Sequence, residues 1–127
     1  MDASQLRSFL EERHYCVLAT TNPDGHAVAR PVAFTVLAGS FWFATVRGAR
    51  LRNLERIPWV SIVIEDGDRG THRAVAVDGP VTISERLPQE LPGLWEERHG
   101  SRADWAAAWF ELQPQRLLSY TAGRTSE

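Results

Sequence analysis

Apolar and polar residues alternate along much of this chain, a pattern typical of β-strands that bury one face. A first strand is predicted over residues 15–21, before the turn at Asn22-Pro23-Asp24-Gly25. The alternation predicts further strands over 26–37, 41–46, 59–65, 71–85 and 110–121, the last broken at Pro114. Helical spacing predicts a helix that ends near His14, a second that ends before Pro58, and short pieces over 85–108, the last carrying Trp105 and Trp109. About six strands with an N-terminal helix and short helices favour a mainly β fold, a small antiparallel barrel with helices as lids.

Three residues interrupt the pattern of the predicted strands. Pro31 cannot donate to a β-ladder, so it marks an edge strand or a bulge. Arg30 lies in an otherwise apolar row, so it either meets an anion or carboxylate or extends to water at a sheet margin. Gly79, followed by Pro80, indicates a barrel bend, although it could instead leave room for a flat ligand or a partner subunit.

The stretch from Thr45 to Pro58 carries the most distinctive chemistry. A strand is followed by a turn at Gly48 and by a short helix whose apolar stripe is formed by Leu51, Leu54 and Ile57. A helix N-terminus attracts anions through its unpaired N–H groups. Thr45 supplies a hydroxyl, and Arg47 and Arg50 supply cations suited to phosphate. We interpret this corner as a phosphate site; the alternative is an ordinary solvated basic helix start.

Composition limits the class of protein. A chain of 127 residues is expected to form a single domain over 1–127. The net charge is −2, with fourteen arginines and no lysine, so the basic surplus of a typical nucleic-acid binder is missing. The sequence shows no signal peptide and no apolar run of the ~20 residues that a membrane helix needs. We therefore expect a cytoplasmic protein without nucleic-acid or membrane partners.

Two further features bear on catalysis and assembly. Cys16 and the four histidines form no nucleophile–base pattern and no metal-ligand pattern, so we expect no catalytic side chain and no metal site. Four of the five tryptophans exceed what one small core covers: Trp59, Trp95, Trp105 and Trp109. Excess aromatic residues often mark an interface, so we expect a homodimer.

Several motifs follow one another along nearly the whole chain: Val17-Leu18-Ala19-Thr20-Thr21, Pro23-Asp24-Gly25, Arg30-Pro31-Val32-Ala33-Phe34, Phe41-Trp42-Phe43-Ala44-Thr45, Ala49-Arg50-Leu51-Arg52-Asn53-Leu54, Pro58 and residues 75–79. In this order they resemble the pyridoxamine 5'-phosphate oxidase-like family, the flavin-binding split barrels. The resemblance implies a split antiparallel β-barrel that dimerises, with two cofactor sites between the subunits.

The resemblance also implies which residues hold the cofactor. The strand of Arg30, Pro31 and Val32 would lie along the isoalloxazine and ribityl groups, and the segment from Thr45 through Arg47 and Ala49 to Arg50 would hold the phosphate. Many family members have Ser-Lys where this chain has Ala49-Arg50. Asn53 would lie close to the phosphate or brace the helix. Trp109 and Arg116 are candidates for residues lent by the partner subunit.

The implied cofactor is flavin mononucleotide (FMN), with the deazaflavin coenzyme F-420 as the alternative, and with haem or no cofactor also open. A flavin performs hydride transfer itself. The expected function is an FMN-binding oxidoreductase that acts on a small substrate. A flavin-binding protein without turnover and a structural dimer remain open. The C-terminal Arg-x-His segment of the vitamin B6 oxidase is missing, and the substrate cannot be identified from the sequence.

Overall fold

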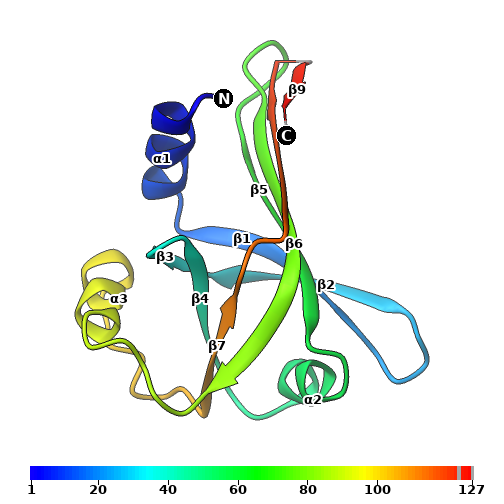
Figure 1. Cartoon of the computed structure of the whole chain (residues 1–127), viewed down its shortest axis with the longest axis vertical. Coiled ribbons are helices and arrows are strands. Elements are labelled where there is room, and N and C mark those ends of the chain that lie inside the picture. The colour runs from blue at the N-terminus through cyan, green and yellow to red at the C-terminus, as the bar shows by residue number, and fades with distance from the viewer. Residues whose placement is uncertain (123, 127) are drawn as a thin grey trace.

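The computed structural model describes residues 1–122 and 124–126 (Figure 1). The three helices of these residues are α1 (Ala3–Glu12), α2 (Ala49–Arg56) and α3 (Leu91–His99). The strands are β1 (Tyr15–Thr21), β2 (Ala27–Ala33), β3 (Thr35–Leu37), β4 (Ser40–Thr45), β5 (Trp59–Asp66), β6 (Arg73–Ser84), β7 (Ala108–Leu112), β8 (Arg116–Thr121) and β9 (Arg124–Ser126). No helix among these residues is long and apolar enough to span a membrane.

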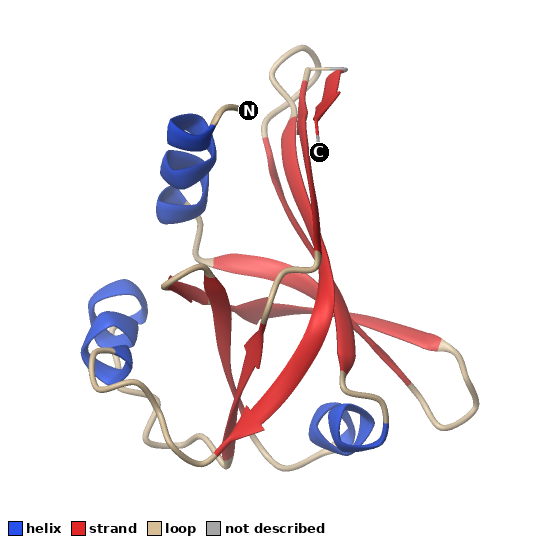
Figure 2. Ribbon diagram, viewed as in Figure 1, coloured by secondary structure: helices blue, strands red, loops and turns tan. Residues whose placement is uncertain are grey.

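One curled antiparallel sheet contains all the strands, and the helices lie around its ends (Figure 2). The strand order is β2-β1-β5-β6-β7-β4-β3, with β8 against β6 and β9 against β8. The long strand β6 pairs with β5 along one side; on the other side its first half pairs with β8 and its second half with β7. This change of neighbour curls the sheet into a half-barrel, so the predicted split β-barrel with flanking helices is confirmed.

Gly79 lies where β6 changes neighbour. A Cβ atom at this position would lie 2.2 Å from the main-chain oxygen of Gln113. The Gln113 N–H donates to the Pro80 oxygen at 3.1 Å, and the Gln115 N–H donates to the Asp78 oxygen at 2.9 Å. The pairing of β6 with β5 runs through Gly79 without a bulge, and the space beside Gly79 is filled by the chain's own β7–β8 connection.

The predicted strand over 26–37 is two strands, because the chain leaves one half of the sheet and joins the other. β2 pairs with β1 without a bulge, and β3 pairs with β4. The Phe34 N–H donates to the His14 oxygen at 3.1 Å, which fixes the alternation of bonded pairs in the β1–β2 ladder. Every second residue of β2, counted back from Phe34, forms hydrogen bonds with β1. Pro31 falls between two of these residues, so its backbone faces away from β1. Pro31 thus lies on the open edge of the sheet, where its missing N–H breaks no ladder bond.

The interior has two apolar clusters. The main cluster fills the half-barrel with strand residues of one parity, together with Phe9 of α1 and Leu54 of α2. The second lies under α3 and contains Trp42, Trp95 and Trp109. The Trp95 and Trp109 rings meet edge to face at 5.1 Å. Trp95 and Trp109 are therefore core residues and not surplus aromatic residues, whereas Trp59 and Trp105 are exposed.

Four other predictions differ from the structure. Residues 101–107 contain no helix, and Trp109 lies in β7, because it pairs opposite Ala44 of β4. Ile57 follows α2 and is exposed; Asn53 takes the buried place on the helix. Arg124–Ser126, beyond the last predicted strand, form β9 against β8. Gly123 and Glu127 lie outside the described residues.

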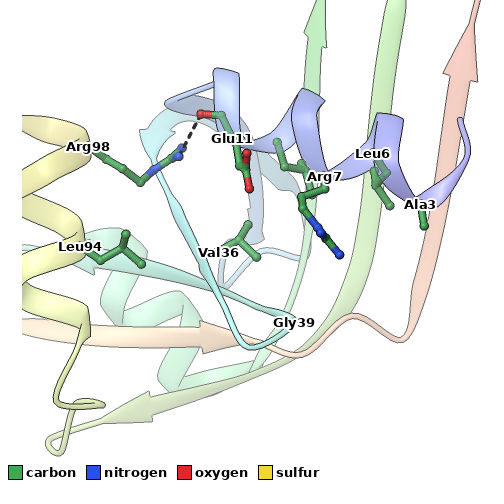
Figure 3. A pocket seen from close by; sticks show the side chains of 9 residues that line it. Ala3, Leu6, Arg7, Glu11, Val36, Gly39, Leu94 and Arg98 are labelled. Carbon is green, nitrogen blue, oxygen red and sulfur yellow. Dashed lines mark hydrogen bonds between the residues drawn. The ribbon is translucent and has the colours of Figure 1, made fainter.

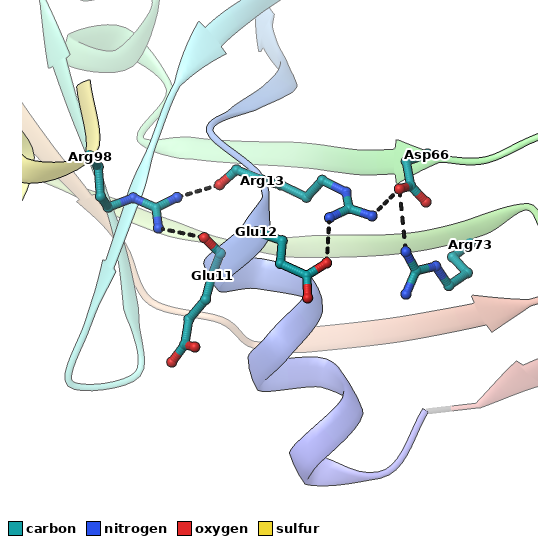
Figure 4. Close-up of polar contacts among 6 residues, drawn as sticks. All are labelled: Glu11, Glu12, Arg13, Asp66, Arg73 and Arg98. Atoms are coloured by element: carbon teal, nitrogen blue, oxygen red, sulfur yellow. Dashed lines mark hydrogen bonds and ion pairs between the residues drawn. The ribbon is translucent and has the colours of Figure 1, made fainter. Parts of the chain in front are cut away.

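Polar contacts cap the start of α1 and join its end to the sheet. Asp2 caps the helix by accepting from the Gln5 N–H at 2.8 Å. At the other end, Arg13 pairs with Asp66, which also accepts from Arg73 at 3.3 Å (Figure 4). Because Asp66 belongs to β5, these contacts join α1 to the β5–β6 hairpin.

Candidate functional site

The start of α2 presents free backbone donors. Gly48 is the N-cap residue and forms no side-chain cap. The first hydrogen bond of the helix runs from the Arg52 N–H to the Gly48 oxygen at 3.1 Å. The N–H groups of Ala49, Arg50 and Leu51 therefore precede the intrahelical ladder, and together with the helix dipole they favour an anion at this end.

A pocket of about 190 Å³ lies beside this helix start, and we call it the α2 pocket. The β1–β2 hairpin forms one wall and α2 forms the other. Its lining residues are Leu18, Thr20, Asn22, Val28, Arg30, Ala49, Arg50 and Asn53. Four of the predicted cofactor residues, Arg30, Ala49, Arg50 and Asn53, are thus brought together from two separate segments.

Two arginines concentrate positive charge at the α2 pocket. Burial lowers the pKa of Arg50, the nearby Cys16 acts in the opposite direction, and the positive charge of Arg30 lowers it further. Arg30 itself is exposed and donates to the Ala29 oxygen at 2.8 Å. Since no carboxylate lines this pocket, the two arginines repel each other without compensation. An anion between them would relieve that repulsion.

The Asn53 side chain connects α2 to the β1–β2 hairpin beside the α2 pocket. Its amide nitrogen donates to the Thr20 hydroxyl at 3.1 Å and to the Asn22 side-chain oxygen at 3.0 Å. Arg56 donates to the main-chain oxygen of Thr21 as well. These contacts hold α2 against β1, which is the bracing role foreseen as one of the two possibilities for Asn53.

The remaining predicted residues lie elsewhere. Thr45 is buried, and its hydroxyl donates to the Val46 oxygen at 3.2 Å. Arg47 and Trp109 line a second pocket of about 350 Å³, which also contains Glu55 and Glu85. This second pocket lies on the other side of the segment that enters α2, so Arg47 and Arg50 do not share one cavity.

The edge strand splits its predicted residues between two faces. Val32 is buried in the main cluster, whereas Pro31 is exposed. Arg116 lies in β8 opposite Asp78, away from the residues that line the α2 pocket.

The sequence analysis missed four lining residues: Leu18, Thr20, Asn22 and Val28. The register of the β1–β2 hairpin could have identified three of them. The turn at Asn22-Pro23-Asp24-Gly25 sets a register in which Leu18 lies opposite Arg30 and Thr20 opposite Val28. Residues of β1 that share parity with Leu18 therefore face the same side as Arg30.

The α2 pocket is built for binding rather than for acid–base chemistry. Among its lining residues there is no histidine, aspartate, glutamate or cysteine. Burial raises the pKa of the neighbouring Cys16 to about 12, with Arg50 acting in the opposite direction, so its thiol stays protonated at neutral pH. The described residues contain no group of three or more His, Cys, Asp or Glu that could hold a metal ion.

Comparisons with known proteins extend these observations. The family model described as pyridoxamine 5'-phosphate oxidase matches residues 3–126. Curated proteins give no match.

Solved structures share the fold. A conserved hypothetical protein from Mycobacterium tuberculosis is 25% identical, with a TM-score of 0.83 over 96% of this chain and 86% of that one. The haem storage protein HutZ from Vibrio cholerae is 22% identical, with a TM-score of 0.76 over 94% and 93% of the two chains. An FMN-binding protein from Nostoc punctiforme, related to pyridoxamine 5'-phosphate oxidase, is 15% identical, with a TM-score of 0.70 over 94% and 83%.

Proposed function

Because the chain belongs to the pyridoxamine 5'-phosphate oxidase family, we propose that it binds FMN with the phosphate in the α2 pocket. The observation that carries the proposal is that Arg30 and Arg50 both line the α2 pocket, beside the helix start that has no side-chain cap. A phosphate monoester carries close to two negative charges at neutral pH. Two guanidinium groups and a helix N-terminus match that charge.

The residues fit a phosphate in their chemistry. Arg50 offers a forked donor that suits phosphate oxygens. The small side chain of Ala49 leaves the first N–H groups of α2 open to a ligand. The Asn53 amide is already engaged by Thr20 and Asn22, so it positions the helix rather than contacting the anion.

A bound flavin would supply the hydride transfer of an oxidoreductase. This chain would bind the phosphate, orient the ring along the β2 edge through backbone groups that face away from β1, and exclude water from one side. No lining residue of the α2 pocket holds or moves a proton at neutral pH. For that reason a flavin-binding protein without turnover is the second candidate function.

We also propose that the protein is a homodimer. The sheet face opposite the main cluster exposes apolar side chains: Tyr15, Val17, Trp59 and Val63 are 67%, 47%, 42% and 41% exposed. Val17 lies directly opposite Val63, so these two side chains lie side by side on β1 and β5. Apolar patches of this kind mark interaction sites. Light scattering should give twice the monomer mass, and Val17→Lys together with Val63→Lys should give the monomer mass; a monomeric parent would refute the dimer.

The first test of the cofactor is the absorption spectrum of the purified protein, followed by titration with FMN, FAD, the deazaflavin coenzyme and haem. Micromolar or tighter binding of FMN supports the proposal. Binding of the deazaflavin coenzyme alone would replace FMN with that coenzyme. Haem binding without flavin binding would refute the assignment of the α2 pocket, because no histidine lines it.

Turnover separates the two candidate functions. Reduction of the bound flavin by a nicotinamide, followed by reoxidation with a small conjugated acceptor, supports an oxidoreductase. Tight binding of FMN without either half-reaction supports the binding protein.

A further inference from the structure

A pocket of about 520 Å³ lies between α1, the β3–β4 turn and α3, separate from the α2 pocket (Figure 3). We call it the α1–α3 pocket. Its volume falls within the roughly 300–1,000 Å³ of small-molecule sites. None of its lining residues lines the α2 pocket, so what it binds is independent of the flavin proposal.

The walls of the α1–α3 pocket are apolar. Leu6 comes from α1, Val36 from β3 and Leu94 from α3 (Figure 3). Leu10, one helical turn after Leu6, also lines the pocket. All four side chains are half-buried, and Leu6, Leu10 and Val36 pack against the main cluster with their inner sides only. Covering the outer sides would remove further apolar surface from water, which is favourable by about 25 cal/mol per Å².

Arg98 bridges the two helices at one end of the pocket. Its guanidinium donates to the main-chain oxygen of Glu11 at 3.1 Å and to that of Arg13 (Figures 3 and 4). It also lies over the Phe34 ring, 5.5 Å from the centroid. Arg98 therefore links α3 to the end of α1, and its guanidinium donates to backbone oxygens.

The charges of the lining favour an anion. Arg7, Glu11 and Arg98 carry two positive charges and one negative charge. Glu11 interacts electrostatically with Arg98, which leaves Arg7 as the second cation. Arg7 is exposed, lines the pocket from α1, and has no hydrogen bond or ion pair with the residues that the structure describes.

We propose that the α1–α3 pocket binds a small amphipathic carboxylate. Its apolar body would lie against Leu6, Leu10, Val36 and Leu94, and its carboxylate would pair with Arg7. The occupant is a free small molecule, since a hydrocarbon chain with one acid group matches both the apolar walls and the single unpaired cation.

The test uses octanoate as the probe, with octanol and octylamine as matched compounds that keep the tail and change the head group. Each is titrated into the full-length protein, with any cofactor it retains, by calorimetry. We expect octanoate to bind about fivefold more tightly than octanol, the upper range for an exposed ion pair. Octylamine should bind more weakly still, because the net charge of the lining repels it.

Variants locate the binding. Arg7→Gln should weaken octanoate about threefold to fivefold and leave octanol unchanged. Arg69→Gln, an exposed arginine in the β5–β6 loop, is the matched control and should change neither. Leu94→Trp should fill the pocket and abolish binding of both compounds, with circular dichroism as the check on folding. Methyl NMR of the parent protein locates the bound octanoate independently, without any variant.

Three results would overturn the proposal. The first is equal affinity for octanoate and octanol in the parent protein. The second is unchanged octanoate affinity in Arg7→Gln. The third is methyl shifts on octanoate binding that spare Leu6, Leu10, Val36 and Leu94. An absence of octanoate binding would overturn it as well, as would follow if a second copy of the chain covered the pocket.

Discussion

Arg98 and Glu11 are 87 residues apart in sequence, yet the Arg98 guanidinium donates to the Glu11 main-chain oxygen at 3.1 Å. A second donation reaches the Arg13 oxygen. Both oxygens belong to the end of α1, where carbonyl groups lack partners within the helix. Arg98, which belongs to α3, therefore supplies hydrogen-bond donors to the end of α1. The same two hydrogen bonds hold α3 in place against α1.

Arg98→Met should lower the free energy of unfolding by about 2 kcal/mol, because two backbone acceptors lose a charged donor in a half-buried place. Urea unfolding measures the change. Arg102→Met is the matched control on the same side of the molecule. Arg102 pairs with Glu96 at 3.1 Å in solvent, so this variant should cost less than about 0.5 kcal/mol. Equal effects of the two variants would contradict the bridging role.

Gly79→Ala should lower the free energy of unfolding by about 3 kcal/mol or more. The added methyl group would lie 2.2 Å from the Gln113 oxygen, so the backbone of β6 or of the β7–β8 connection must shift. Gly93→Ala in α3 is the control, because its Cβ would meet no atom within 4 Å. That variant should be neutral or stabilising by up to about 1 kcal/mol, since alanine favours the helix. Thermal unfolding of both variants distinguishes the two positions.

Arg50→Gln should weaken FMN binding about tenfold or more, because a charge-assisted hydrogen bond to phosphate would be replaced by a neutral one. Arg52→Gln, on an exposed position of the same helix, removes an equal charge and should change the affinity less than twofold. Fluorescence titration of FMN measures both. If the two variants weaken binding equally, the effect is one of overall charge, and the phosphate does not lie in the α2 pocket.

The stability of the fold should depend on the protonation of His99. Burial lowers its pKa; the hydrogen bond to the Phe34 oxygen acts in the opposite direction, and the charges of Arg98 and His14 lower the pKa further. The unfolded chain therefore takes up a proton at a higher pH, near 6.5, than the folded one. The free energy of unfolding should be greatest above that pH and fall as the pH decreases toward the folded-state pKa.

Urea unfolding at pH 7.5 and 5.5 measures this dependence. His99→Gln should reduce the loss of stability between the two values. His26→Gln, at a histidine whose side chain is 82% exposed, should leave the loss as it is in the parent. A loss that is the same in all three proteins would assign the pH dependence to other groups.

Local sequence patterns predicted much of the fold. β1, which precedes the turn at Asn22-Pro23-Asp24-Gly25, was predicted with its observed ends, and Pro58 placed the end of α2 within two residues. Such features depend on neighbours in sequence, so the sequence alone suffices.

What the sequence did not reveal depends on pairing between distant segments. Trp109 lies in a strand because β4 and β6 flank it, although its spacing from Trp105 is that of a helix. For the site, two segments that were each singled out, around Arg30 and around Arg50, prove to be neighbours. That Arg47 faces a different pocket from Arg50 follows from the path of the chain into α2, which the spacing of charges does not specify.

The place of Pro31 has a consequence for how molecules of this protein can associate. β2 is the outermost strand on its side of the sheet, and its outward backbone groups are open. A strand from another molecule that lengthened the sheet along β2 would find no donor at Pro31, near the middle of the ladder. Growth of the sheet by edge-to-edge addition is therefore blocked on this side. Pro31 thus protects the open edge of β2 against edge-to-edge pairing, and it does so without costing the sheet a hydrogen bond of its own ladder.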